Sequence, residues 1–200
     1  MLVLIGLFAI AVAIYFTRAD NGVYDASDVL GQYDPPVTTY PPLYTNGDPW
    51  NAGSTVNNQG FSGNSQMAID PTTHMLFVAD TVSNRVLGYS IGVDGTLVDH
   101  TADVALGQQD FTSSTSGLSD FEMSGPKAVA IDLVNRQLFV ADTGNNRVMV
   151  FNITDGATTG MVALYVIGQP SAFDNTAGTS QALLSQPTGL DYDHGSNVLY

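Results

Sequence analysis

"LFVADTGNNRVMVF" spans Leu138–Phe151, and "LFVADTVSNRVLGY" spans Leu76–Tyr89, 62 positions earlier. The segments around these two stretches repeat with nearly the same spacing. "SGNSQMAID" (Ser62–Asp70) precedes "SGPKAVAID" (Ser124–Asp132) by 62 positions, and "ALGQQD" (Ala105–Asp110) is followed 61 positions later by "VIGQPS". Similarity at a fixed period indicates stacked copies of one supersecondary unit.

Each copy contains four short runs that are rich in β-branched and aromatic residues. In the second copy these runs are "KAVAID", "QLFVAD", "RVMVFNI" and "MVALYVIGQ", separated by clusters of Gly, Asn and Asp. Such runs are typical of β-strands, and no helical period of 3.6 residues follows the first 20 residues. The sequence therefore predicts an all-β chain in which four-stranded antiparallel sheets repeat as the blades of a β-propeller.

The period also predicts how the chain is divided. "DVLGQYD", at residues 28–34, matches the end of the copy without a copy before it, so it is interpreted as a strand that closes the last blade. Two and a half blades do not close a ring, so we expect the chain to be part of a longer propeller. The predicted segments are 1–19 (signal peptide or membrane anchor), 20–200 (partial propeller), 28–34 (closing strand), 35–61 (loop insert), 62–110 (first blade), 124–171 (second blade) and 186–200 (start of a third blade).

The second copy, Pro126–Phe151, resembles the NHL repeat, which is a β-propeller blade motif. The first copy departs from the motif at Asn64, where the family has proline, and at Val82, where it has glycine. The resemblance covers roughly Val29 to Tyr200. It implies a propeller fold but no single activity, because NHL propellers include RNA-binding modules, extracellular sensor or adhesion domains, and relatives of lactonases and amidating lyases.

Four polar positions of the motif keep the same residue in both copies, including Thr81 and Thr143. A catalytic residue is normally unique in a chain, whereas a residue that stabilises a blade recurs in every blade. Asn suits the turn between the second and third strands, because it tolerates a left-handed backbone and bonds to nearby main-chain groups. The Asp before the turn and the Arg after it can meet across the hairpin or against the next blade. We therefore interpret the recurring residues as structural: Asp80, Asn84, Arg85, Asp142, Asn146 and Arg147.

The amino-terminal segment is apolar. "LVLIGLFAIAVAIYF" (Leu2–Phe16) contains no charged residue and is followed by Arg18. Its length and composition predict a hydrophobic helix that acts as a cleaved signal peptide or an uncleaved membrane anchor, with a buried core helix as the third alternative. A basic residue after the run and none before it weakly disfavour the export orientation. We expect a secreted or extracytoplasmic protein that contacts a membrane only through this segment.

The charge of the chain excludes some partners. The sequence has 19 acidic and 5 basic residues, for a formal net charge of −14, and Glu122 is the only Glu. Such a chain repels nucleic acid and anionic lipid headgroups, so we expect no nucleic-acid partner. The absence of cysteine excludes a disulfide framework and a thiolate metal site.

The sequence predicts no catalytic or metal-binding motif. His74, His100 and His194 do not recur at one repeat position, and we interpret His74 and His194 as solvated turn residues. "DYDHGSN" (Asp191–Asn197) carries oxygen ligands but lacks the spacing of an EF-hand. No cofactor is therefore predicted, and calcium at this stretch stays an open alternative.

The function that these observations favour is a binding scaffold for a protein, a glycan or a small ligand. Exposed aromatic residues are common at interfaces, so the candidates for ligand contact are Tyr40, Tyr44 and Trp50 in the insert. The non-repeating loops Phe111–Ser124 and Phe173–Ser185 are further candidates. One alternative is a metal-dependent propeller enzyme of the lactonase or amidating-lyase kind, with an axial site completed by blades outside this chain. Another is a purely structural or adhesive repeat array.

Overall fold

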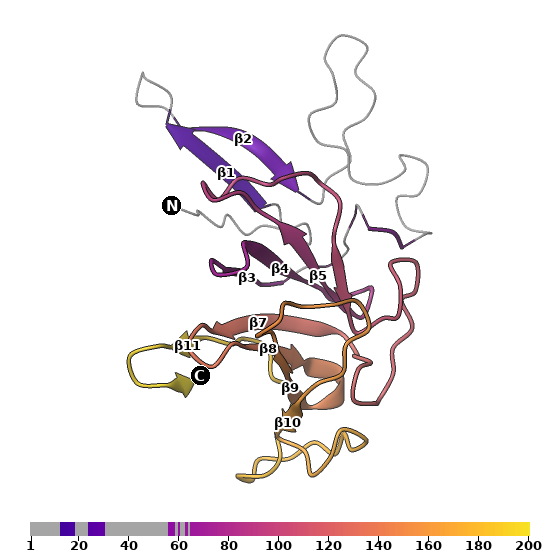
Figure 1. Cartoon of the computed structure of the whole chain (residues 1–200). Coiled ribbons are helices and arrows are strands. Elements are labelled where there is room, and N and C mark those ends of the chain that lie inside the picture. The colour runs from indigo at the N-terminus through magenta and orange to yellow at the C-terminus, as the bar shows by residue number, and fades with distance from the viewer. Residues whose placement is uncertain (1–12, 19–23, 31–55, 59, 61–62, 64) are drawn as a thin grey trace.

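Two four-stranded antiparallel sheets form the body of this computed structural model (Figure 1). The structure describes residues 13–18, 24–30, 56–58, 60, 63 and 65–200. The first sheet has the strand order β3-β4-β5-β6, and the second has the order β10-β9-β8-β7. Strands adjacent in sequence are therefore adjacent in space, as in a β-meander.

The strands coincide closely with the apolar runs. The first sheet consists of β3 (Met67–Asp70), β4 (Met75–Asp80), β5 (Arg85–Ser90) and β6 (Val104–Leu106). The second sheet consists of β7 (Pro126–Asp132), β8 (Gln137–Asp142), β9 (Arg147–Asn152) and β10 (Tyr165–Ile167). A third hairpin, formed by β11 (Tyr192–Asp193) and β12 (Val198–Leu199), begins the same pattern again. The prediction of an all-β chain with four-stranded antiparallel sheets is confirmed.

Equivalent turns have the same backbone conformation. His74, Arg136 and Asn197 occupy matching positions in the three first hairpins, with φ of 54°, 55° and 56°. Asn84 and Asn146 occupy the next turn of the two sheets, with φ of 53° and 54°. In the second sheet this turn contains the short 3-10 helix η2 (Thr143–Asn145). Asparagine suits the left-handed position because its short polar side chain bonds locally.

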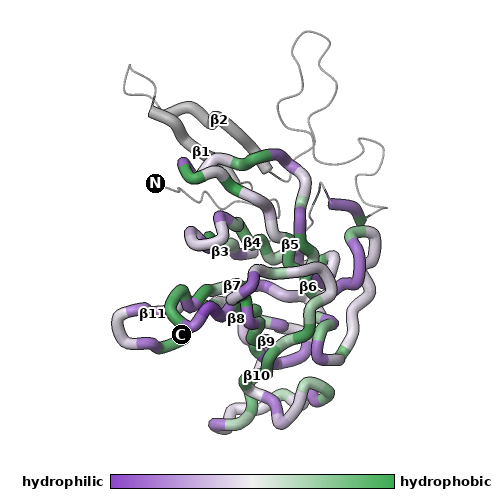
Figure 2. Tube along the Cα trace, viewed as in Figure 1, coloured by the Kyte–Doolittle hydropathy of each residue, from purple (hydrophilic) through white to green (hydrophobic). Residues whose placement is uncertain are grey.

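The two sheets pack face to face. β7 lies against β3 and β4, and side chains of both sheets, such as Phe77, Leu106, Val129 and Ile131, belong to one buried cluster. The other face of the second sheet packs on Leu190 from the third hairpin. Figure 2 shows the hydrophobic residues concentrated along the strands of the two sheets, while hydrophilic residues are frequent in the turns. Burial of these faces is the main stabilising contribution, since apolar area contributes about 25 cal/mol per Å² removed from water.

The predicted amino-terminal helix is wrong over residues 13–16. These residues belong to β1 (Ala13–Arg18), which pairs antiparallel with β2 (Tyr24–Leu30), so that Ile14 lies opposite Val29. Branched and aromatic side chains favour a strand once a partner strand is available. The rest of the expected helix, residues 2–12, lies outside the described residues. Within the described part of the chain, no helix has the length and hydropathy needed to cross a bilayer.

The segment predicted as a closing strand is described only up to residue 30. Val29 and Leu30 lie in β2 and pair with β1. Residues 31–34 lie outside the described residues, as do 35–55 of the predicted insert. The closing role of residues 28–34 stays a prediction.

Candidate functional site

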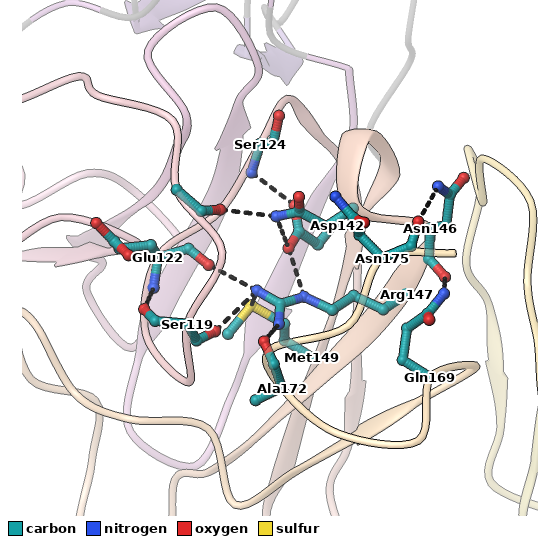
Figure 3. A network of polar contacts seen from close by, with 12 residues as sticks. Ser119, Glu122, Ser124, Asp142, Asn146, Arg147, Met149, Gln169, Ala172 and Asn175 are labelled. Carbon is teal, nitrogen blue, oxygen red and sulfur yellow. Dashed lines mark hydrogen bonds and ion pairs between the residues drawn. The ribbon is translucent and has the colours of Figure 1, made fainter. Parts of the chain in front are cut away.

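The recurring Asp and Arg meet across the β8–β9 hairpin. Arg147 Nε donates to Asp142 Oδ2 at 2.7 Å, and both side chains are fully buried (Figure 3). The first sheet has the same arrangement, with Arg85 Nε donating to Asp80 Oδ2 at 2.8 Å. Burial raises the pKa of Asp142, because desolvation of the carboxylate outweighs the hydrogen bonds that it accepts. Both pairs are thus interior groups that no solute reaches from solvent.

Each guanidinium also holds the loops on either side of its sheet. Arg147 Nη2 donates to the carbonyl oxygens of Ser119 (2.9 Å) and Glu122 (2.8 Å) in the preceding loop. Its Nη1 donates to the carbonyl of Ala172 in the following loop (Figure 3). Arg85 repeats this pattern, with three bonds to the carbonyls of Asn57 (2.8 Å), Gly60 (3.0 Å) and Phe111 (2.7 Å). The planar five-donor group of arginine suits such a junction.

The recurring asparagines join each sheet to the next element. Asn84 Oδ1 accepts from the N–H of Gly125 at 2.8 Å, and Asn146 Oδ1 accepts from the N–H of Gln186 at 2.9 Å. A glutamine donates to the main-chain carbonyl of each of these asparagines. Gln108 Nε2 donates to the carbonyl of Asn84 at 3.0 Å, and Gln169 Nε2 donates to the carbonyl of Asn146 at 2.8 Å. Sequence reasoning did not select the two glutamines. Their signal was present in the recurring Gly-Gln dipeptide of "ALGQQD" and "VIGQPS".

A further recurring carboxylate accepts a donor from the next element along the chain. Asp70, at the end of β3, is buried and accepts from both Nη atoms of Arg136 at 2.9 and 2.6 Å. Asp132, at the end of β7, accepts from the hydroxyl of Tyr192 at 2.6 Å. Burial alone raises the pKa of Asp70, but hydrogen bonds from Arg136, Thr73 and Thr72 outweigh it and lower that pKa to about 2. These contacts were not predicted.

A pocket of about 200 Å³ lies where the first strands of the three repeats come together. Its lining comes from Gln66–Ile69, from residues 129–131 with Leu133, and from Leu190–Tyr192 with His194. Gln66 spans the pocket, because its Nε2 donates to the carbonyls of Val129 (3.2 Å) and Leu190 (2.7 Å). One small cavity thus touches all three repeats.

The third repeat makes the pocket polar. At the positions of Asp191 and Tyr192, the first sheet has Ala68 and Ile69, and the second has alanine and isoleucine as well. The ring of Tyr192 is stacked on Phe139, with centroids 5.5 Å apart, and the ring of His194 meets Tyr192 edge-on at 5.2 Å. The lining therefore includes three residues of the third repeat that differ from their equivalents in the other repeats: Asp191, Tyr192 and His194.

The ligand candidates predicted from sequence are only partly described. Tyr40, Tyr44 and Trp50 lie outside the described residues. Within the loop Phe111–Ser124, main-chain carbonyls bind the buried arginines, and Met123 is fully buried. In the loop Phe173–Ser185 most residues are exposed. Among the residues that the structure describes, no group of three or more His, Cys, Asp or Glu side chains is arranged to hold a metal ion.

A family model for the NHL repeat matches residues 123–151. This stretch contains β7, β8 and β9 together with Asp142, Asn146 and Arg147. Over this stretch the chain is similar to the NHL repeat. The glycine of the repeat allows a close approach, because a Cβ at Gly144 would lie 2.7 Å from the carbonyl oxygen of Ser124. The first sheet carries the same Asp, Asn and Arg outside the matched stretch, with Val82 in place of that glycine.

The comparison with curated proteins gives no match. Among solved structures, the chain is similar to hydrazine synthase of Kuenenia stuttgartiensis, at 12% identity and a TM-score of 0.40, over 74% of this chain and 30% of the other. It is also similar to an auxiliary nutrient-binding protein from Bacteroides thetaiotaomicron, at 13% identity and a TM-score of 0.49, over 69% of this chain and 34% of the other. The matched region thus spans about a third of each of those proteins.

Proposed function

We propose that the two sheets and the third hairpin are successive blades of an NHL-type β-propeller, and that the propeller is a binding module. Its ligand occupies the pocket between the first strands of the three repeats. The partner class is a protein segment, a glycan or a small ligand, and nucleic acid is disfavoured by the net charge of −14. Proteins that share such a fold often differ in function, because function depends on the residues of a particular site. The pocket, rather than the fold, therefore supports the proposal.

The observation that carries this proposal is the segregation of two kinds of residue. The recurring Arg85 and Arg147 are fully buried and bonded to carboxylate and main-chain oxygens, which suits a structural role. The polar residues that do not recur, Asp191, Tyr192 and His194, line one cavity. Small ligands usually bind in concave sites that carry a few convergent polar groups.

A fragment screen followed by backbone amide NMR tests the proposal on the complete protein. We expect the shift changes caused by bound fragments to cluster at residues 67–69, 129–133 and 190–194. Clustering in the loops 111–124 and 173–185 instead would place the binding surface where the sequence alone predicts it, and would contradict the pocket. The insert that carries Tyr40, Tyr44 and Trp50 stays a second proposed contact surface, and the same spectra test it.

Export through residues 1–19 is part of the same proposal. The apolar run Leu2–Phe16 supports it, since signal peptides require an apolar stretch of about 7–15 residues. A secreted or anchored propeller would meet its ligand outside the cytoplasm. The enzyme alternative, with an axial metal, stays a prediction that metal analysis of the complete protein tests.

A further inference from the structure

The first strands of the two sheets each have one unpaired edge. β3 pairs only with β4, and β7 pairs only with β8. Both strands belong to complete four-stranded sheets, so these edges do not depend on how far the third repeat extends. An unpaired edge carries main-chain N–H and C=O groups that can bond to another chain.

The hydrogen-bond pattern identifies the residues whose main-chain groups face this edge in β3. In an antiparallel pair, successive residues of a strand alternate between bonding to the partner strand and facing away from it. Gln66 is bonded to β4, because its carbonyl accepts from the N–H of Ala79 at 3.0 Å. The main-chain groups of Met67 and Ile69 therefore face away from β4, toward the pocket that both residues line.

The other two repeats direct equivalent groups toward the same pocket. Val129 and Ile131 have the corresponding places in the register of β7 with β8. In the third repeat, Asp191 exchanges main-chain hydrogen bonds with the opposite side of its hairpin at 3.0 and 2.8 Å, so Leu190 and Tyr192 face away from it. All four edge residues line the pocket. Their main-chain groups account for a pocket surface that is more polar than apolar, although most of the lining side chains are apolar.

The side chain of Gln66 shows how an amide group binds to these edges. Its Nε2 donates to the carbonyl of Leu190 at 2.7 Å, and its Oε1 accepts from the N–H of the same residue at 3.4 Å. A residue of a neighbouring antiparallel strand would make the same two bonds. The Nε2 group also donates to the carbonyl of Val129 at 3.2 Å. The other two repeats have alanine and glycine at this position, and neither side chain can make such a contact.

The edge of β3 is the part that Gln66 leaves available. Within the described part of the chain, the side-chain bonds to the edge groups of the three repeats all come from Gln66, and none goes to Met67 or Ile69. Ile69 is 41% exposed, which places this edge within reach of a solute. The groups of Met67 and Ile69 are two residues apart and repeat at about 6.8 Å, which is also the repeat of an extended peptide.

The volume of the pocket limits the ligand to a short piece of chain. A cavity of roughly 150 Å³ accommodates benzene, and this pocket measures about 200 Å³. A single residue with its two flanking peptide groups therefore fits. A longer segment would extend beyond the lining.

We propose that the pocket binds a peptide segment through main-chain hydrogen bonds to the free edge of β3. The proposal rests on the proposed function, because it names the ligand class of the same pocket. The peptide adds to the edge as a short strand. Its principal partner is Ile69, whose N–H donates to a peptide carbonyl and whose C=O accepts from a peptide N–H, as Leu190 does with the side chain of Gln66.

Two probes of the same shape test this proposal: N-acetylglycine N-methylamide and its ester counterpart, methyl acetoxyacetate. The ester keeps both carbonyl oxygens but has no N–H donor. Each is titrated into the complete protein while NMR of the backbone N–H groups reports the position and the affinity of binding. We expect the amide to shift residues 67–69, 129–133 and 190–194 and to bind at least about threefold more tightly than the ester, which is the effect of one lost hydrogen bond. Methyl glucoside represents a glycan ligand and should bind more weakly than the amide.

Replacement of Ile69 by proline removes the N–H at the edge, and Ile69→Ala is the matched control. Both variants lose the isoleucine side chain, but only Ile69→Pro loses the donor. Because this N–H faces away from β4, no hydrogen bond of the sheet is lost, and proline is tolerated at such edge positions. Ile69→Pro should bind the amide at least about threefold more weakly than Ile69→Ala does. The unfolding midpoint of each variant checks that it is folded.

The outcomes separate the two proposals. Equal affinity of the wild type for the amide and the ester would overturn recognition through the strand edge, and so would equal affinity of folded Ile69→Pro and Ile69→Ala for the amide. The comparison of the two probes needs no variant, so it stands even if Ile69→Pro does not fold. Binding of methyl glucoside at the pocket in place of the amide would overturn the peptide class and leave the pocket as the binding site. Binding of the amide only at the loops 111–124 or 173–185 would contradict both the ligand class and the pocket.

Discussion

Replacement of Arg147 by alanine leaves Asp142 as a buried carboxylate without its cation. In the structure the two side chains are fully buried and 2.7 Å apart. The guanidinium also donates to the carbonyls of Ser119, Glu122 and Ala172, so the variant removes the partner of three further, partly buried acceptors. Breaking a buried ion pair from one side costs about 3–5 kcal/mol. We expect Arg147→Ala to lower the free energy of unfolding by that amount.

Urea denaturation followed by circular dichroism measures this loss. Arg85→Ala, at the same position of the first sheet, should lose a similar amount, because its guanidinium has equivalent partners. Lys127→Ala serves as the control for the loss of one positive charge and should change stability by less than about 0.5 kcal/mol. Arg147→Met keeps most of the side-chain volume and should still be strongly destabilised, whereas adding Asp142→Asn to it should recover part of the loss.

Two results would refute this reasoning. A cooperative transition for Arg147→Ala within about 1 kcal/mol of the wild type would mean that the pair contributes no more than an ordinary hydrogen bond. Additive losses in the double variant would mean that Asp142 and Arg147 do not interact, despite the distance between them.

Three further predictions concern the junctions between repeats and the amino terminus. In the folded protein the pKa of Asp70 is lowered from 3.8 to about 2, which is below its value in the unfolded chain. This group therefore stabilises the fold above about pH 4, and its contribution is lost as the pH falls toward 2. Between pH 7 and pH 2, the wild type should therefore lose about 1–2 kcal/mol more stability than Arg136→Gln in urea titrations; equal losses would contradict this. Asn146→Gly should cost about 1–2 kcal/mol through its hydrogen bonds, and Asn146→Ala about 1 kcal/mol more because φ is positive; equal stability of the two variants would argue against a backbone contribution. Fractionation of the native host should find the protein outside the cytoplasm or on a membrane, and intact cytoplasmic protein would disprove export through residues 1–19.

The strands could be predicted because each depends on local composition. The apolar runs that end at Asp80 and Asp142 are bounded by Asn and Gly, and the structure places β4 and β8 on them. The Asp and Arg flanking each turn left two arrangements open, and the structure has the one across the hairpin. The apolar segment at the amino terminus was ambiguous, since a run of this kind suits a helix or a strand. Residues 13–16 form a strand because they pair with β2.

The contacts between repeats were not predictable from one sequence. Arg136 and Asp70 are 66 positions apart, and they meet only because β7 packs against β3. The hydrogen bonds from Arg147 go to main-chain carbonyls of irregular loops. Because every residue has a main-chain carbonyl, the residue types of these loops do not predict such bonds. The pocket could not be predicted either, because it forms only where the repeats come together. Its polar residues stand at positions where the other repeats are apolar. Comparing the copies position by position would have singled out Asp191 as a departure, but not the cavity that it borders.

The central claim is that recurring residues stabilise the fold, whereas residues that differ between repeats bind the ligand. The most direct test measures, for Arg147→Lys in the complete protein, the unfolding midpoint and the amide shift changes that bound fragments cause. The account predicts a lower midpoint for Arg147→Lys, with the fragment-induced shifts unchanged at residues 67–69, 129–133 and 190–194. An unchanged midpoint together with lost binding in Arg147→Lys would contradict it.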